Sequence, residues 1–164
     1  MGAIERKTVE SILGLAVALT LTLGIGLAGG LATASSVGTW YVTLEKPSWT
    51  PPDGLFGPVW TALYIMMGIA AWLVWRRADE GRASLPLLLF ALQLLLNAGW
   101  SLLFFGFRSP GLALADIALL WLAIAATLWA FARVRGWAAL LLAPYLAWVS
   151  FAAALNLAIW RMNA

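Results

Sequence analysis

The sequence predicts an all-α integral membrane protein in which five transmembrane helices form a bundle of a single domain. The chain has 164 residues, of which 63% are hydrophobic and only 10% are charged. A soluble domain carries about 25% charged residues, and one soluble core could not bury so much apolar surface. The apolar residues also lack the alternating pattern of a membrane β-barrel. Helices are therefore the expected spanning elements.

Five apolar runs give these helices in order. They cover residues 11–37, 58–75, 85–105, 112–131 and 137–160. Each run is close to the ~20 residues that cross a bilayer, and the connections are short, so residues 1–164 are expected to form one domain. The first run is long and rich in glycine, which predicts a tilted helix or a frayed end. It exceeds the ~7–15 apolar residues of a signal peptide, so we expect it to be retained despite the small residues Ala32 to Ser35.

The connection between the first two runs is unusually rigid and aromatic. The stretch WYVTLEKPSWTPPDGLFGPVW, from Trp40 to Trp60, holds three Trp, one Tyr and four Pro. Proline fixes φ and discourages helix, so residues 38–57 are predicted to form an ordered, non-helical lid, with Pro58 at the start of the next helix. An interfacial aromatic belt is the alternative for Trp40 and Tyr41, although a belt does not require four prolines.

Basic residues predict the orientation of the bundle. One side would carry Arg6, Lys7, Arg76, Arg77, Arg82, Arg133 and Arg135, and the other side only Lys46, Arg108 and Arg161. By the positive-inside rule, the N-terminus is cytoplasmic and the lid lies on the outer face. The net charge of +3 is explained by this topology and does not indicate binding to nucleic acid.

The composition excludes most kinds of catalytic site. The chain has neither Cys nor His, so the usual zinc sites, the commonest haem ligation and Ser-His or Cys-His catalysis are ruled out. Paired carboxylates and phosphate-binding loops are also missing from the sequence. No catalytic residue and no metal site is therefore predicted.

Three of the predicted helices carry an aromatic or polar face. The sets, spaced at helical intervals, are Trp60, Tyr64 and Met67; Gln93, Asn97 and Ser101, with Trp100 beside them; and Tyr145, Trp148, Ala152 and Asn156. The stripe of Trp60, Tyr64 and Met67 either packs against other helices or lines a ligand site. Lipid cannot satisfy polar groups, so Gln93, Asn97 and Ser101 face the bundle interior, where they either form hydrogen bonds between helices or line a cavity. In the last set, small Ala152 beside Trp148 would leave room for a flat guest.

Two further features have alternative interpretations. Asp116 lies inside an apolar run, where a carboxylate has a functional or a pairing role, and its position near Arg108 favours a structural one. Gly26 and Gly30 form a GxxxG motif, which allows close helix approach either in a dimer or within one bundle. Eleven Trp without any His indicate a binder of a large, flat, apolar molecule.

Four stretches occur in a recognisable order between about Gly26 and Arg161: WYVTLEKPSWTPP, FGPVWTALYIMMG, QLLLNAGWSLLFFG and PYLAWVSFAAALN. They resemble the TspO/MBR family, which comprises the bacterial tryptophan-rich sensory proteins and the mitochondrial translocator protein, or peripheral benzodiazepine receptor. The resemblance covers nearly all of the chain.

The resemblance implies a five-helix protein, often a homodimer, with a ligand pocket closed by the first loop. Family ligands include porphyrins such as protoporphyrin IX, sterols, and benzodiazepine-type and isoquinoline drugs. Carried over residue by residue, the pocket would include Trp40, Tyr41, Pro51, Trp60, Tyr64, Asn97, Trp100, Trp148, Ala152 and Asn156. The animal members have a proposed cholesterol motif with a Tyr before its Arg, whereas here Leu157 and Ala158 precede Arg161, which argues against tight cholesterol binding.

Residues and resemblance together predict a membrane receptor for porphyrins and similar hydrophobic ligands that regulates tetrapyrrole metabolism or stress signalling. No cofactor is expected to be required, since porphyrin would be a ligand. Because no imidazole can serve as an axial ligand, metal-free porphyrin is expected to bind better than haem. The other expected partners are the lipid bilayer and a second copy of the chain, in the cell membrane of a bacterium or, alternatively, its outer membrane.

Two other functions stay open at this point. The protein could transport porphyrin or sterol, although no inverted repeat is evident. It could also degrade bound porphyrin with light and oxygen, with Trp60 and Trp148 as redox-active neighbours, because such chemistry needs no acid–base pair.

Overall fold

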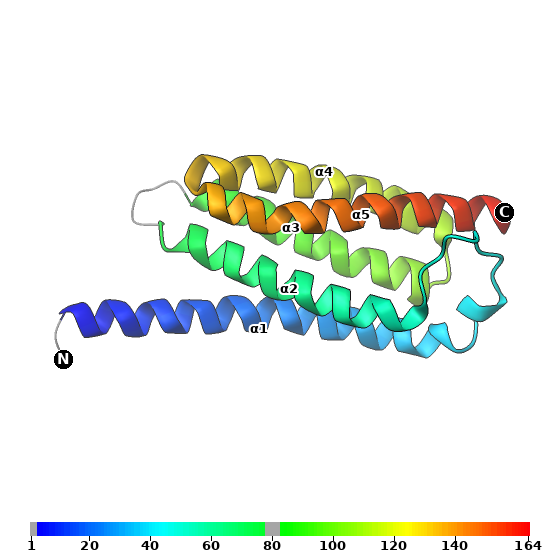
Figure 1. The fold of residues 1–164 in the computed structure, drawn as a ribbon, viewed down its shortest axis with the longest axis horizontal. Helices are drawn as coiled ribbons and strands as arrows, with labels where there is room; N and C mark the ends of the chain where they lie inside the picture. Colours follow the sequence, from blue (N-terminus) through cyan, green and yellow to red (C-terminus); the bar gives the residue numbers. More distant parts are fainter. Residues whose placement is uncertain (1–2, 78–82) are drawn as a thin grey trace.

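The computed structural model describes residues 3–77 and 83–164, in which five long helices lie side by side (Figure 1). The helices are α1 (Ala3–Val37), α2 (Asp53–Trp75), α3 (Ser84–Ser101), α4 (Pro110–Val134) and α5 (Gly136–Met162). A short 3₁₀ helix, η1 (Tyr41–Thr43), lies in the first loop, and a π-helical segment, η3 (Leu102–Gly106), continues α3. Within the described ranges, five helices are long and apolar enough to cross a membrane, which confirms the predicted architecture.

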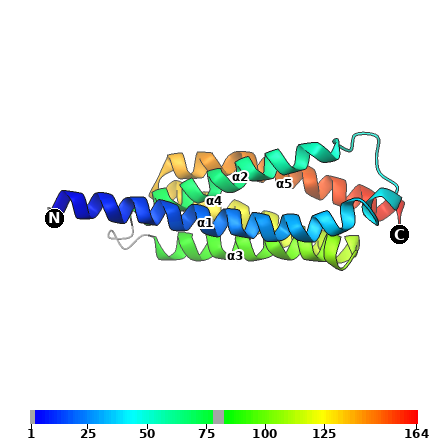
Figure 2. The same cartoon turned by 90° about the horizontal axis from the view of Figure 1, so that it is seen from below.

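Helix α1 lies at the edge of the bundle and projects beyond it at the N-terminal end (Figures 1 and 2). Only 11% of its most apolar segment is buried, against 39% for α2 and for α5. Its exposed side chains include Leu13, Val17, Leu21 and Leu27. These residues are apolar and unpartnered within the described chain, so they suit contact with lipid.

Glycines allow α1 and α2 to approach each other closely. A Cβ added at Gly14 would overlap the ring of Trp75, and one added at Gly26 would overlap the ring of Tyr64. In the reverse direction, Gly68 on α2 receives Leu19 and Thr22 of α1. Small residues at a membrane helix contact permit this kind of packing. Gly26 therefore serves packing within one chain, which was one of its two predicted roles.

The predicted lid is shorter than expected. Helix α2 begins at Asp53, so residues 53–57 are helical and the non-helical loop covers residues 38–52, apart from η1. Pro58 lies inside α2 rather than at its start. Pro52 has an extended backbone and ends the loop, and Asp53 places a negative charge in the first turn, where the helix dipole favours it. The ring of Pro58 is tolerated in the second turn, where it is exposed.

The charged residues gather as predicted at the two ends of the bundle. Helix α1 starts, α2 ends, and α4 meets α5 at the same end (Figure 1). That end carries Arg6, Lys7, Arg76, Arg77, Arg133 and Arg135, while Arg82 lies outside the described residues. Lys46, Arg108 and Arg161 belong to the opposite end, where the first loop lies. The side of the membrane that each end faces stays a prediction.

Candidate functional site

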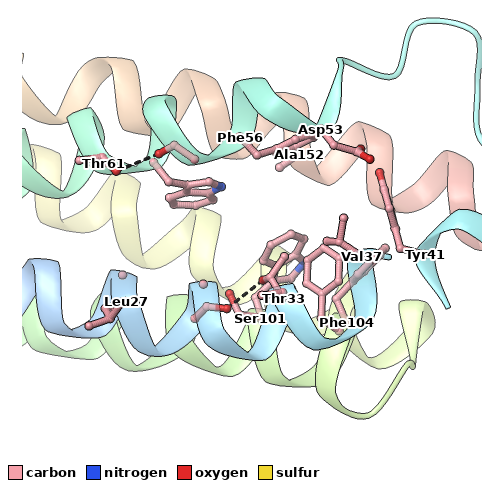
Figure 3. A pocket seen from close by; sticks show the side chains of 18 of the residues that line it. Leu27, Thr33, Val37, Tyr41, Asp53, Phe56, Thr61, Ser101, Phe104 and Ala152 are labelled. Atoms are coloured by element: carbon pink, nitrogen blue, oxygen red, sulfur yellow. Dashed lines mark hydrogen bonds between the residues drawn. The ribbon is translucent and has the colours of Figure 1, made fainter. Parts of the chain in front are cut away.

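A cavity of about 530 Å³ lies at the loop end of the bundle, between α1, α2, α3 and α5. Figure 3 shows α1 with Leu27 and Thr33 on one side of it and α2 with Phe56 and Thr61 on the other. Most of the lining is aromatic or small and apolar. The cavity lies between bulky aromatic side chains and glycines, which have no side chain to fill it.

Six of the ten site residues carried over by resemblance line this cavity. They are Tyr41, Trp60, Tyr64, Trp100, Ala152 and Asn156. They come from η1, α2, α3 and α5, so the fold brings together residues from four separate elements. Their role in binding a ligand stays a prediction.

The other four predicted residues do not line the cavity. Trp40 packs edge-on against Phe104, with ring centroids 5.7 Å apart. Trp148 lies against Phe56 and Phe151, with centroid distances of 5.9 and 5.6 Å. Asn97 is buried beside Tyr64, behind the wall. Pro51 is part of the loop that leads into α2.

A hydrogen-bonded triad supports the inner wall. Tyr64 donates its hydroxyl to the side-chain oxygen of Asn97, and the amide nitrogen of Asn97 donates to the hydroxyl of Tyr145 at 3.0 Å. All three residues are buried. Trp60 stacks on Tyr64 with a centroid distance of 5.6 Å and an interplanar angle of 29°. The polar groups of α2, α3 and α5 thus fix the orientation of the indole that faces the cavity.

A second polar contact fixes Trp100. Its indole nitrogen donates to the side-chain oxygen of Asn156 at 3.0 Å, and the amide of Asn156 donates to the carbonyl of Pro110 at 2.8 Å. These bonds connect α3, α5 and the start of α4. Trp100 also stacks on Phe104 at 5.5 Å. The side-chain oxygen and nitrogen of Asn156 thus each form one hydrogen bond within the protein.

One residue of the first loop, Tyr41, lines the end of the cavity nearest the loop. Tyr41 is buried and lies opposite Asp53 in Figure 3. Lys46 donates from Nζ to the carbonyl of Tyr41 at 2.7 Å, and the same ammonium lies 4.5 Å from the centre of the Tyr41 ring. Burial, and then the negative charge of Asp53, raise the pKa of Tyr41 to about 12. The hydroxyl therefore stays protonated and neutral at physiological pH.

The loop is fastened to the C-terminal end of α5. The backbone nitrogen of Glu45 donates to the side-chain oxygen of Asn163 at 3.0 Å, and the amide nitrogen of Asn163 donates to the carbonyl of Glu45 at 2.9 Å. Trp49 packs edge-on against Phe151 at 5.7 Å. Both contacts join the loop to α5, as the predicted lid would require.

Sequence reasoning missed the contribution of α1 to the cavity. Gly26, Gly29 and Gly30 all line it, together with Thr33. A Cβ at Gly29 would lie 3.1 Å from Oγ of Ser101, whereas nothing lies within 4 Å of one at Gly30. The glycine-rich run was the available signal, but it was read only as a surface for helix packing.

Other polar residues have roles apart from the cavity. Ser101 lines it, but Gln93 is buried outside it, and its side-chain amide has no hydrogen-bond partner in the described chain. Met67 is fully buried in the core. Asp116 faces α3, where a Cβ at Gly99 would lie 3.1 Å from its Oδ1. Its Oδ2 is buried without a hydrogen-bond partner in the described chain, so the role of Asp116 stays a prediction.

Comparisons with known proteins all point to the same family. The model of the TspO/MBR family matches residues 16–161. "Tryptophan-rich protein TspO" of Chlorobaculum tepidum is 49% identical over 158 residues, which cover 94% of this chain and 98% of that protein. "Translocator protein" of Homo sapiens is 47% identical over 126 residues, covering 76% and 75%. "Tryptophan-rich sensory protein" of Cereibacter sphaeroides is 41% identical over 124 residues, covering 76% and 77%. The chain therefore belongs to the TspO/MBR family and is a multi-pass membrane protein.

Proposed function

We propose that the protein is a receptor for porphyrins, with protoporphyrin IX as the representative ligand, and for similar flat hydrophobic molecules. The observation that carries this proposal is the cavity of about 530 Å³ walled by Trp60, Tyr64 and Trp100. Its volume falls within the ~300–1,000 Å³ of ligand pockets. Aromatic rings offer a macrocycle large apolar contact and offset or edge-on stacking.

The chemistry of the walls favours a metal-free macrocycle. The chain contains no His and no Cys, and these are the common axial ligands of haem iron along with Met and Tyr. Tyr41 and Tyr64 line the cavity, but the hydroxyl of Tyr64 donates a hydrogen bond to the side-chain oxygen of Asn97. Binding would therefore depend on stacking and burial, and protoporphyrin IX is expected to bind more tightly than haem.

The charged residues at the loop end of the cavity would determine the orientation of the bound porphyrin. The propionates of a porphyrin are ionised and must stay in contact with water or with cations. Lys46 lies beside Tyr41 at the loop end, so the propionates would point toward the loop and the apolar edge of the macrocycle toward Leu23 and Leu27 on α1. Asp53 lies at the same end and opposes this arrangement.

A signalling role is part of this proposal. The relative from Cereibacter sphaeroides is named a sensory protein, and a loop fastened by Asn163 provides an element that a ligand could order or release. The protein would then regulate tetrapyrrole metabolism or stress responses from a bacterial cell membrane, as a homodimer. The name "translocator protein" of the mammalian relatives keeps porphyrin transport as the second candidate.

The test is a titration of the purified protein with protoporphyrin IX in the dark, followed by absorbance and by tryptophan quenching. Saturable binding that weakens in Trp60→Leu, but not in the exposed control Trp137→Leu, is expected. Quenching that rises linearly and is the same in both variants would mean that porphyrin only partitions into detergent, and would contradict the proposal. Repeating the titration under light distinguishes a receptor from a protein that degrades porphyrin, because only the latter loses the porphyrin spectrum faster than a protein-free sample in the same detergent. Flux of porphyrin into proteoliposomes above protein-free controls would favour the transporter.

A further inference from the structure

A second cavity, of about 600 Å³, lies between α1, α2 and α3 in the half of the bundle that contains the N-terminus. Its α1 side is formed by Leu13, Gly14, Val17, Ala18 and Leu21. Leu13, Val17 and Leu21 are exposed, so the cavity is a groove that opens sideways, away from the bundle. It shares no lining residue with the first cavity.

The groove has the length of one membrane leaflet. Its lining on α1 extends from Glu10 to Leu21, which is ~16 Å at the helical rise of about 1.5 Å per residue. The hydrocarbon core of a bilayer is ~30 Å thick, so one leaflet measures about half of that. The small side chains of Ala18, Ala71 and Ala91 keep the groove open along this length. A single acyl chain fits such a channel better than a flat macrocycle does.

Charged groups of both signs mark one end of the groove. The indole of Trp72, which lines it, donates to the carbonyl of Ser11 at 2.9 Å. The guanidinium of Arg76 lies 4.9 Å from the centre of the same indole. Glu10, next to Ser11 in the chain, is the one charged residue in the described lining. A cation and a carboxylate therefore lie at the same end, where the membrane surface would be.

We propose that this groove binds a zwitterionic aminophospholipid such as phosphatidylethanolamine. One acyl chain lies between α1 and α3, the headgroup phosphate meets Arg76, and the ammonium meets Glu10. Arginine matches the phosphate through charge-assisted hydrogen bonds. An anionic headgroup that lacks the ammonium would leave Glu10 facing a like charge.

The charges also argue against a second copy of the chain in this place. A helix that filled the groove with apolar side chains would supply no ammonium group for the carboxylate of Glu10 at the surface end. Phospholipid supplies both the apolar chain and the counter-charge.

The experiment uses the full chain, delipidated in detergent and returned to mixed micelles of equimolar phosphatidylethanolamine, phosphatidylglycerol and phosphatidylcholine. Native mass spectrometry then reads which lipid stays bound. We expect one retained phospholipid, enriched in phosphatidylethanolamine. Arg76→Gln should lower its retention about tenfold, the loss expected of one charge-assisted hydrogen bond. Glu10→Gln should abolish the preference for the amine headgroup while lipid is still retained.

A second pair of variants tests the groove by filling it. Ala91→Phe should remove the retained lipid, whereas Ala118→Phe, at an exposed position on α4 outside both cavities, should not. Equal helicity and equal thermal midpoints of the two variants show that both fold. The proposal would be overturned if phospholipids with different headgroups were retained equally and if neither Arg76→Gln nor Ala91→Phe changed the amount retained. A dimer that Ala91→Phe dissociates would also overturn it, because a second copy would then occupy the groove.

Discussion

Tyr64 on α2 and Tyr145 on α5 are joined through one amide: Asn97 accepts a hydrogen bond from the first hydroxyl and donates one to the second. Trp60 rests on this pair, stacked on Tyr64 and edge-on to Tyr145 at 6.2 Å. The polar triad thus lies directly behind the aromatic wall of the cavity. The hydrogen bonds of the triad therefore determine the position of Trp60 in the cavity wall.

Replacing Asn97 by Leu tests this relationship. The variant removes two hydrogen bonds and leaves two buried hydroxyls without that partner, so we expect a loss of about 1–3 kcal/mol of stability and weaker ligand binding through a displaced Trp60. Thermal unfolding in detergent measures the first effect and porphyrin titration the second. Tyr145→Phe, which removes only one of the bonds, should give a smaller effect. Equal stability of Asn97→Leu and the parent protein would mean that the triad contributes nothing.

Two glycines of α1 offer a matched pair of substitutions. Gly26→Ala would drive a methyl group into the ring of Tyr64, whereas Gly30→Ala meets nothing within 4 Å. Overpacking of this kind costs about 1–3 kcal/mol, while alanine in place of an unopposed helical glycine gains up to ~1 kcal/mol. The thermal midpoint should therefore fall in the first variant and hold or rise in the second. If Gly30→Ala were the destabilised one, close packing against another chain at Gly30 would be indicated instead.

Asp53 is the one charged residue in the described lining of the first cavity. Its carboxylate should repel the propionates of a porphyrin, by about 1 kcal/mol for charges 4 Å apart in a watery mouth. Asp53→Asn is expected to tighten binding of protoporphyrin IX several-fold and to leave its dimethyl ester unchanged. Comparison of dissociation constants for the two ligands isolates the charge. An equal gain for both ligands would show that the substitution acts through shape.

The contact between Glu45 and Asn163 predicts how the loop is held. Asn163→Ala removes both hydrogen bonds to Glu45, each worth about 1 kcal/mol, together with the one to the carbonyl of Ile159. The amide of Glu45 and its neighbours in the loop should therefore exchange with deuterium faster. Met162→Ala changes an exposed neighbour and serves as the control. Unaltered exchange in Asn163→Ala would mean that other contacts, such as Trp49 with Phe151, hold the loop without this pair.

Much of the fold was readable from the sequence because a bilayer imposes simple rules. An apolar run of about 20 residues with few charges has little choice but a helix, and the ends of α3, α4 and α5 fall within a few residues of the predicted ones. The start of α2 was wrong, because Pro58 was taken as the first helical residue. The available signal was Asp53, directly after Pro52, because an acidic residue suits the first turn of a helix.

The cavity was only partly predictable, for a physical reason. Helical spacing identifies which residues share a face, and it selected Trp60, Tyr64 and Asn156. It cannot tell whether a face lines a space or packs tightly, since that depends on the neighbouring helix. Trp148 was therefore expected in the cavity but packs on Phe56 and Phe151. Gly30, which lines the cavity, has no side chain from which a role could be inferred.

The most direct test of the central claim is to fill the cavity and measure protoporphyrin IX binding in the dark. Ala152 lies in its wall, so Ala152→Phe should occupy the space that the macrocycle needs. We predict saturable binding in the parent protein and in the lipid-facing control Ala118→Phe, and its loss in Ala152→Phe with helicity unchanged. Unchanged affinity in a correctly folded Ala152→Phe would contradict the account, because the porphyrin would then bind somewhere other than this cavity.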